Sequence, residues 1–143
     1  MPYKMRNLLA TDYLSIKDIF RDEFLGDDIT YRDLRTAWRY KNTDLSLGAV
    51  STANDLIGFT LVRNNYIEYI GTHKHFKGQG LGTRLLKKAL SLSSHKKKSM
   101  HLYPMSQDQR LIHWYERFGF RKTTGGYMNI HYYNTRSNSN VTS

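Results

Sequence analysis

The sequence predicts a single α/β domain, with a mixed, mostly antiparallel sheet flanked by helices in the order βααβββαβαβ. The chain has 143 residues, which is enough for one compact domain and too few for two independent ones. Short strand-like runs alternate with longer stretches whose apolar residues recur at helical spacing. Apolar residues make up 39% of the chain and aromatic residues 13%, so a chain disordered throughout is excluded.

The first half of the chain predicts one strand, two helices and three further strands. Residues 3–8 form the opening strand, and apolar residues at helical spacing predict a helix over 12–24. Thr30, followed three residues later by Asp33, is a capping box that begins a second helix ending near residue 40. Turn sequences separate the next apolar runs, which indicates antiparallel strands at 45–51, 56–63 and 66–73.

In the second half, a glycine-rich turn at 77–82 precedes a helix with an apolar face of leucines that ends near residue 94. A short strand over 100–104 stops at Pro104, and a helix over 106–118 ends at Gly119. A last strand is predicted at 127–133. The domain therefore covers residues 1–133, and the polar segment 134–143 is expected to be a disordered tail.

The absence of cysteine and the shortness of the apolar runs exclude several classes of protein. The sequence contains no cysteine, so disulfides, zinc sites made of thiolates and thiol nucleophiles are excluded. Charged residues interrupt the first 25 positions and the apolar runs are short, so we expect neither a signal peptide nor a membrane span. The expected location is the cytoplasm.

Charge is distributed unevenly along the chain. The sequence has 22 Lys and Arg against 12 Asp and Glu, a net charge of +10. Residues 1–33 hold five basic and seven acidic side chains, whereas 34–143 hold seventeen and five. A basic field favours an anionic partner such as nucleic acid, a membrane surface or a phosphorylated cofactor, and composition alone leaves these open.

The glycine-rich turn is a candidate anion site. Gly78, Gly80 and Gly82 alternate between a strand and a helix, where backbone N–H groups can approach a phosphate at the helix N-terminus. An ordinary flexible connection is the alternative. The turn lacks the GKS or GKT ending of a P-loop, and its third glycine comes one residue too early for a dinucleotide-binding fingerprint.

Two motifs resemble those of the GNAT N-acetyltransferases. The segment HFKGQGLGTRLL (75–86) resembles the family's acetyl-coenzyme A motif Q/RxxGxG/A, with Lys77 in place of the usual first residue. The segment WYERFGF (114–120) resembles its second signature, a YE pair followed by GF. The chain also resembles small polyamine acetyltransferases of this family in chlorella viruses, which implies a virus-encoded protein in the host-cell cytoplasm.

The resemblance implies acetyl-coenzyme A as cosubstrate and assigns its contacts. The pantetheine arm would pair with the backbone near Ile70, Gly71 and Thr72. The diphosphate would lie on the N–H groups of the turn, which are those of Lys77, Gly78, Gln79, Gly80, Leu81, Gly82 and Thr83. Lys77 keeps the positive charge of an arginine but offers a point charge in place of a planar fork.

Acetyl transfer to an amine requires removal of a proton. An alkylammonium with a pKa of about 10.4 costs about 4.6 kcal/mol to deprotonate at pH 7. Glu68, an acid in the basic part of the chain, is the candidate base, acting directly or through water; an outward-facing surface charge is the alternative. Tyr115 resembles the family's tyrosine that protonates the leaving thiolate, and a core aromatic residue is the alternative.

The expected acceptor is a small primary amine. In the family, the first two helices and their connection wall the acceptor side, and here that region is acidic, so Glu23, Asp27 and Asp28 are predicted to bind a polyamine such as spermidine, spermine or putrescine. Acetylation of a peptide or histone lysine, or of a protein N-terminus, is the alternative. A nucleic-acid-binding module, motivated by the net charge and the aromatic residues of 127–133, and a catalytically inactive interaction domain are alternatives of other classes.

Other partners are not expected from these motifs. Neither a membrane nor nucleic acid is the expected partner, and homodimer formation stays open. His73 and His75 form an HxH pair without a third ligand at a suitable spacing, so no metal site is predicted.

Overall fold

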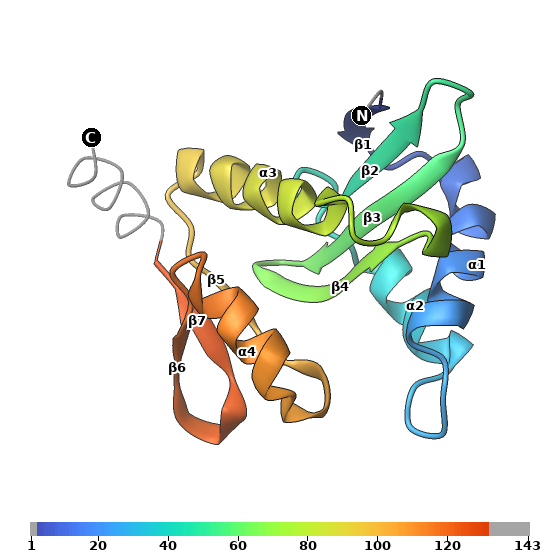
Figure 1. The fold of residues 1–143 in the computed structure, drawn as a ribbon. Coiled ribbons are helices and arrows are strands. Elements are labelled where there is room, and N and C mark those ends of the chain that lie inside the picture. The colour runs from blue at the N-terminus through green and yellow to red at the C-terminus, as the bar shows by residue number, and fades with distance from the viewer. Residues whose placement is uncertain (1–2, 132–143) are drawn as a thin grey trace.

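The computed structural model describes residues 3–131, and these form a seven-stranded sheet and four α-helices (Figure 1). The predicted α/β fold is confirmed. The elements are β1 (Tyr3–Asn7), α1 (Tyr13–Glu23), α2 (Tyr31–Arg39), β2 (Leu47–Ser51), β3 (Leu56–Arg63), β4 (Tyr66–Thr72), α3 (Leu81–His95), β5 (Met100–Leu102), α4 (Gln109–Glu116), β6 (Arg121–Lys122) and β7 (Met128–Ile130).

The strands lie in the order β1-β2-β3-β4-β5-β7-β6, and every neighbouring pair is antiparallel except β4 and β5. The predicted order βααβββαβαβ lacked β6. This strand has two residues, both exposed, so it carries no alternation that a sequence pattern could show. Of the predicted last strand, β7 covers 128–130. The predicted disordered tail at 134–143 lies outside the described residues.

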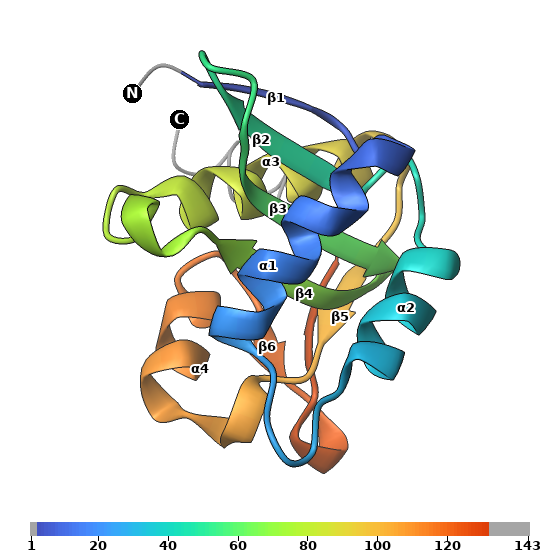
Figure 2. The ribbon, with the colours of Figure 1, turned by 90° about the vertical axis from the view of Figure 1, so that its right-hand side faces the viewer.

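Helices cover both faces of the sheet. Helices α1 and α2 lie on one face, where their buried side chains pack on Phe59 and Leu61 of β3 (Figure 2). Helix α3 packs on the opposite face and shares an apolar cluster with α4, β5 and β7. Strand β3 lies between these layers and is buried from Leu56 to Val62, which explains its nearly continuous apolar sequence.

Local sequence signals explain most helix ends. The backbone N–H of Thr30 donates to the Asp33 carboxylate at 2.7 Å, as the predicted capping box requires. Helix α4 begins at Gln109. The residue before it, Asp108, caps the helix, because its side chain accepts a hydrogen bond from the Arg110 N–H at 2.9 Å. The helix predicted from residue 106 starts later because the preceding residues, Ser106 and Gln107, have φ angles of 55° and 50°.

An ion pair fixes the start of α1 against the edge of the sheet. The Arg6 guanidinium donates to both carboxylate oxygens of Asp12, at 2.7 and 3.0 Å, and the Leu9 N–H donates to the same carboxylate at 2.7 Å. Burial favours the protonated acid, but these hydrogen bonds outweigh it and lower the pKa of Asp12. The pair orients α1, whose far end reaches the functional site. In the described part of the chain, no helix combines the length and hydropathy needed to cross a membrane.

Candidate active site

The site begins where β4 and β5 separate. Strand β4 pairs with β3 from Tyr66 to Thr72, but its parallel pairing with β5 is limited to Tyr66 and His101 (Figure 1). Beyond that position, the second edge of β4 has no strand partner within residues 3–131. Backbone N–H and C=O groups are seldom left unpaired, so this edge is suited to an extended ligand that carries amides.

A β-bulge in β4 sets the direction of Glu68. Leu61 of β3 is opposite Tyr69, whereas the next residue, Val62, is opposite Ile67. Glu68 is therefore the extra residue of the bulge, with no direct partner on β3. Bulges re-aim side chains and occur next to active sites, and here Glu68 lines a cavity together with its neighbours on β4.

Two adjacent hollows follow this edge of the sheet. The larger, of about 730 Å³, lies between β4, the end of β5, α4 and the connection between α1 and α2. The smaller, of about 340 Å³, lies at the N-terminus of α3, against the glycine-rich turn and Trp114. Glu23, the last residue of α1, borders both hollows. Ligand segments bound in the two hollows would therefore be neighbours.

The glycine-rich turn leaves open space in front of α3. Gly78 and Gly80 have φ angles of 78° and 79°, and a Cβ at either position would meet no atom within 4 Å. A Cβ at Gly82 would have only Thr72 Oγ1 near it, at 3.8 Å. The first N–H groups of α3 have no acceptor within the helix, so they point toward this space. The arrangement can hold a phosphate group.

Lys77 and Glu23 form an ion pair across the smaller hollow, with exposed fractions of 53% for Lys77 and 19% for Glu23. The sequence assigned them to different ligands, Lys77 to the cofactor and Glu23 to the amine. The structure instead brings them together at the border between the two hollows. An anion bound at the turn would therefore compete with Glu23 for the Lys77 ammonium.

Glu68 is mostly buried and paired. Its side chain is 17% exposed, and Oε1 lies 2.7 Å from Arg63 Nη2 in an ion pair. Burial raises the pKa of Glu68, Arg63 opposes this shift, and the charge of Asp33 adds to it, so that the pKa is raised overall. A carboxylate with a raised pKa is a stronger base. Glu68 can therefore accept a proton inside the larger hollow.

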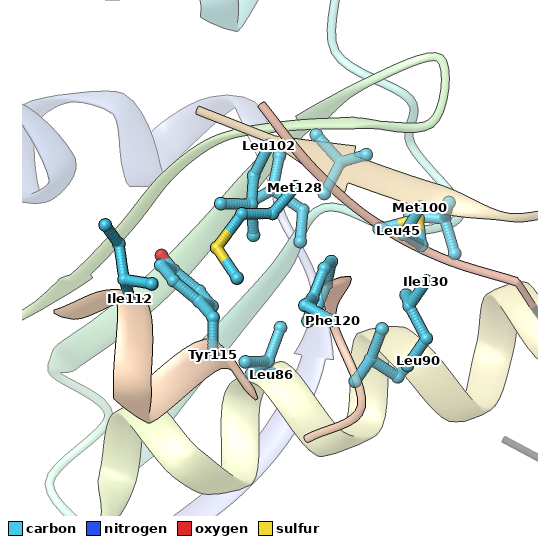
Figure 3. Close-up of a cluster of buried hydrophobic side chains, with 12 residues drawn as sticks. Leu45, Leu86, Leu90, Met100, Leu102, Ile112, Tyr115, Phe120, Met128 and Ile130 are labelled. Carbon is cyan, nitrogen blue, oxygen red and sulfur yellow. The ribbon is translucent and has the colours of Figure 1, made fainter. Parts of the chain in front are cut away.

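Tyr115 combines a packed ring with a hydroxyl group at the edge of the core. Figure 3 shows the ring beside Leu86 and Ile112, with its oxygen at the margin of the apolar cluster, and Tyr115 borders the larger hollow. Burial, with a further contribution from Tyr66, raises the pKa of Tyr115 to about 12. The phenol stays protonated at neutral pH and can donate a proton to a bound group.

The remaining predicted residues divide into those that line the hollows and those that do not. Ile70 borders the larger hollow, as do the exposed Asp27 and Asp28, and Thr72 and Thr83 border the smaller one. Gly71 lies beneath Phe59, where a Cβ would come within 2.6 Å of the ring. The Gln79 side chain turns toward the carbonyl of His75. Leu81 borders the smaller hollow but is only 1% exposed, so it offers only its backbone there.

Two other groups of polar residues lie outside the hollows. Of the acids in the first segment, Asp18 and Asp22 pair with Arg21, away from the hollows. The Nδ1 atom of His73 accepts a hydrogen bond from the His75 N–H at 3.2 Å. Residues 3–131 contain no group of three or more side chains placed to hold a metal ion.

The aromatic walls of the hollows were not predicted from the sequence. Tyr66, Tyr69 and Tyr103 line the larger hollow and Trp114 the smaller one. The spacing of tyrosines in YIEYI was visible in the sequence, but the bulge that turns them toward one cavity was not. The loop at Ser106 is also part of this wall, and it is held by Gln107 Nε2, which donates to the Gly126 carbonyl at 3.2 Å.

Comparison with known families agrees with this geometry. A model of the acetyltransferase (GNAT) family matches residues 13–120, more than half of the chain. The chain belongs to this family. It is therefore an N-acetyltransferase that uses acetyl-coenzyme A, which supplies the acetyl group as a thioester when bound. Among curated protein sequences, none matches the chain.

Solved structures share the fold at low sequence identity. The GNAT acetyltransferase YhbS from Escherichia coli in complex with CoA has a TM-score of 0.71 and 15% identity, over 92% of this chain and 82% of that one. The ribosomal-protein-S18-alanine N-acetyltransferase from Escherichia coli gives 0.67 and 18%, over 89% and 88%. A phosphinothricin acetyltransferase from Sinorhizobium meliloti in complex with AcCoA gives 0.70 and 17%, over 92% and 89%. The acceptors of the last two enzymes differ, so the fold does not select one.

The open space at Gly82 leads to a test of the anion site. We expect Gly82→Val to weaken coenzyme A binding at least about tenfold in calorimetry, because the side chain would occupy the place of the phosphates. The thermal midpoint should change little, since Thr72 Oγ1 is the only nearby atom. Ser91→Val, at an exposed position on the same helix, should keep the parent affinity. Unchanged coenzyme A affinity in Gly82→Val would show that the diphosphate does not bind at this turn.

Proposed function

We propose that this enzyme transfers the acetyl group to a primary amine of a polyamine. The observation that supports this acceptor is the set of carboxylates around the larger hollow, in a protein whose net charge is +10. Glu23, Asp27, Asp28 and Glu68 all border that hollow. A free polycation approaching a basic protein is repelled overall, so productive binding requires a local field of the opposite sign.

The aromatic wall supports a cationic acceptor independently. Tyr66, Tyr69 and Tyr103 border the same hollow as the carboxylates, and aromatic faces attract alkylammonium groups. A flexible amine with several charges can meet both kinds of contact at once. A peptide lysine carries one such charge. It is the alternative acceptor, and turnover measured with both kinds of amine distinguishes it from a polyamine.

The cofactor contacts proposed here use the backbone of two segments. The N–H groups from Lys77 to Thr83 would hold the diphosphate, with the Lys77 ammonium exchanging Glu23 for a phosphate. The unpaired edge of β4 near Ile70, Gly71 and Thr72 would pair with the pantetheine amides. Gly71, which does not line the hollows, and Leu81, whose side chain is buried, take part in this scheme through backbone atoms alone.

Glu68 and Tyr115 would then transfer the protons. The raised pKa of Glu68 brings it nearer to that of the ammonium that it must deprotonate, directly or through a water molecule. Tyr115 would give its proton to the sulfur that leaves when the acetyl group moves to the amine. Arg63 would act through Glu68, as a positioning residue that holds the carboxylate in the hollow.

Removal of the Tyr115 hydroxyl tests the proposed acid. We expect Tyr115→Phe to lower kcat by about 10²-fold, because the proton donor is lost while the ring keeps its packing. Coenzyme A affinity and the thermal midpoint should stay close to those of the parent. Tyr127→Phe, at an exposed position, is the matched control. Full activity in Tyr115→Phe would return this residue to a purely structural role.

The pH dependence of the rate tests Glu68. A base must be deprotonated to act, so activity falls as the pH drops through its pKa, and the raised pKa of Glu68 places this loss above the usual range of a glutamate. Arg63→Gln removes the cation that opposes the shift, and the acid limb of kcat/KM should move to higher pH. Glu68→Gln should lose most activity, relative to the parent, at pH values just above the pKa of Glu68, where the parent carboxylate is ionised and the amine is hardest to deprotonate. The exposed Glu116→Gln is the control.

A profile of Glu68→Gln that runs parallel to that of the parent would contradict this role. It would show that bulk solvent takes the proton.

The acceptor is tested by turnover with spermidine and with a histone-tail peptide. Neutralising the exposed pair as Asp27→Asn with Asp28→Asn should raise KM for spermidine about 2- to 30-fold, and more at low salt. KM for acetyl-coenzyme A should not change. The pair Asp18→Asn with Asp22→Asn, which removes the same charge beside Arg21, should leave both constants unchanged.

Equal kinetics of the Asp27 and Asp28 variant at all salt concentrations would remove the electrostatic reason for a polyamine. Faster turnover of the peptide than of spermidine would make a peptide lysine the acceptor.

A further inference from the structure

Helix α2 carries an arginine-rich hollow that the acetyl-transfer site does not use. Arg32, Arg35 and Arg39 are exposed and, at spacings of three and four residues, share one face of the helix. With Trp38 and Tyr40 they line a hollow of about 600 Å³. None of its lining residues borders either hollow of the active site. The hollow is therefore a separate surface.

The charges on α2 are segregated. Asp33, the only acid of the helix, accepts a hydrogen bond from the Thr30 N–H, and its charge raises the pKa of Glu68 and of Tyr69. Asp33 therefore acts on the acetyl-transfer side. Among residues 3–131, no carboxylate forms an ion pair with Arg32, Arg35 or Arg39.

Like charges three and four residues apart destabilise a helix slightly. Within the described chain, no acid offsets the repulsion between the three arginines. An anionic partner bound to this face would reduce that repulsion. From Arg32 to Arg39 the helix rises about 10 Å, which matches about three nucleotides of a stacked strand at 3.4 Å per nucleotide. The spacing suits a row of phosphates more than a single ion.

The aromatic residues of the hollow add a second kind of contact. The Lys41 ammonium lies 3.8 Å from the centre of the Trp38 ring, and Tyr13 packs on the same ring at 5.3 Å. Trp38 is thus fixed in place as part of the floor. Tyr40 is 58% exposed, with the Arg39 guanidinium 5.6 Å from its ring centre. Its free face, beside a guanidinium plane, is suited to stacking against a base.

We propose that this face of α2 binds single-stranded nucleic acid, with Arg32, Arg35 and Arg39 on consecutive phosphates and Tyr40 on a base. A positively charged groove combined with stacking residues is the pattern of proteins that bind single strands without sequence preference. The proposal does not rest on the identity of the amine acceptor. It differs from the expectation drawn from the sequence motifs, which describe only the cofactor side of the molecule.

The test measures the fluorescence anisotropy of a labelled uridine oligomer of about 12 nucleotides on the full chain. The triple variant Arg32→Gln, Arg35→Gln and Arg39→Gln should bind at least about tenfold more weakly, and the slope of log K against log salt should become shallower by about 2. Tyr40→Ala should weaken binding about fivefold or more at unchanged salt slope.

A charge-matched triple variant at exposed positions elsewhere, Lys88→Gln, Lys98→Gln and Lys122→Gln, separates the patch from the net charge. It should keep the parent affinity within about threefold. Acetyl-transferase turnover should be the same in both triple variants, so a failure of this proposal and a failure of the proposed function are distinguishable. The single variant Arg35→Gln gives a graded measurement with less change to the helix.

Several results would overturn the proposal. One is an equal loss of affinity in the two triple variants, which would assign binding to the bulk charge. Another is an unchanged affinity in Tyr40→Ala, which would exclude base stacking. The third is absence of oligomer binding together with arginine-dependent sedimentation on phosphatidylserine vesicles, which would assign the face to a membrane surface.

Discussion

The active site depends on the incomplete pairing of one strand. Strand β4 pairs with β3 from Tyr66 to Thr72 and pairs with β5 only at Tyr66 and His101. If the parallel pairing continued, β5 would cover the edge that the proposed pantetheine path uses, and the larger hollow would close. Because α3 and α4 pack on the same side of the separated strands, the opening is bounded by helices and does not collapse. The helices therefore border the opening that the separated strands leave in the sheet.

Electrostatics organises the two ends of that gap in opposite ways. At the start of α3, Lys77 and the helix N-terminus favour an anion, while the carboxylates of the α1–α2 connection and Glu68 favour a cation. Glu23 lies at the border and is paired with Lys77. The net charge of +10 thus conceals a local separation of charge, and that separation fits a reaction between an anionic donor and a cationic acceptor.

Features with local causes could be predicted from the sequence, whereas features produced by tertiary contacts could not. The capping box at Thr30, the strands of the meander and the glycine turn each depend on residues close in sequence. Glu68 was found as an acid in a basic region, but the bulge that aims it arises from register against β3. The left-handed backbone at Ser106 and the pairing of Lys77 with Glu23 involve neighbours distant in sequence, which no local pattern shows.

Burial raises the pKa of both groups that are proposed to transfer protons. The higher pKa makes one of them a stronger base and keeps the other protonated as an acid. In Glu68, burial is the leading cause of a raised pKa, which makes the ionised carboxylate a better acceptor of a proton. In Tyr115, burial is again the leading cause and raises the pKa to about 12, which keeps the phenol protonated. Arg63 opposes the shift in Glu68 and favours its ionised form, whereas Tyr115 stays neutral. One apolar environment can in this way maintain a base and an acid at the same pH.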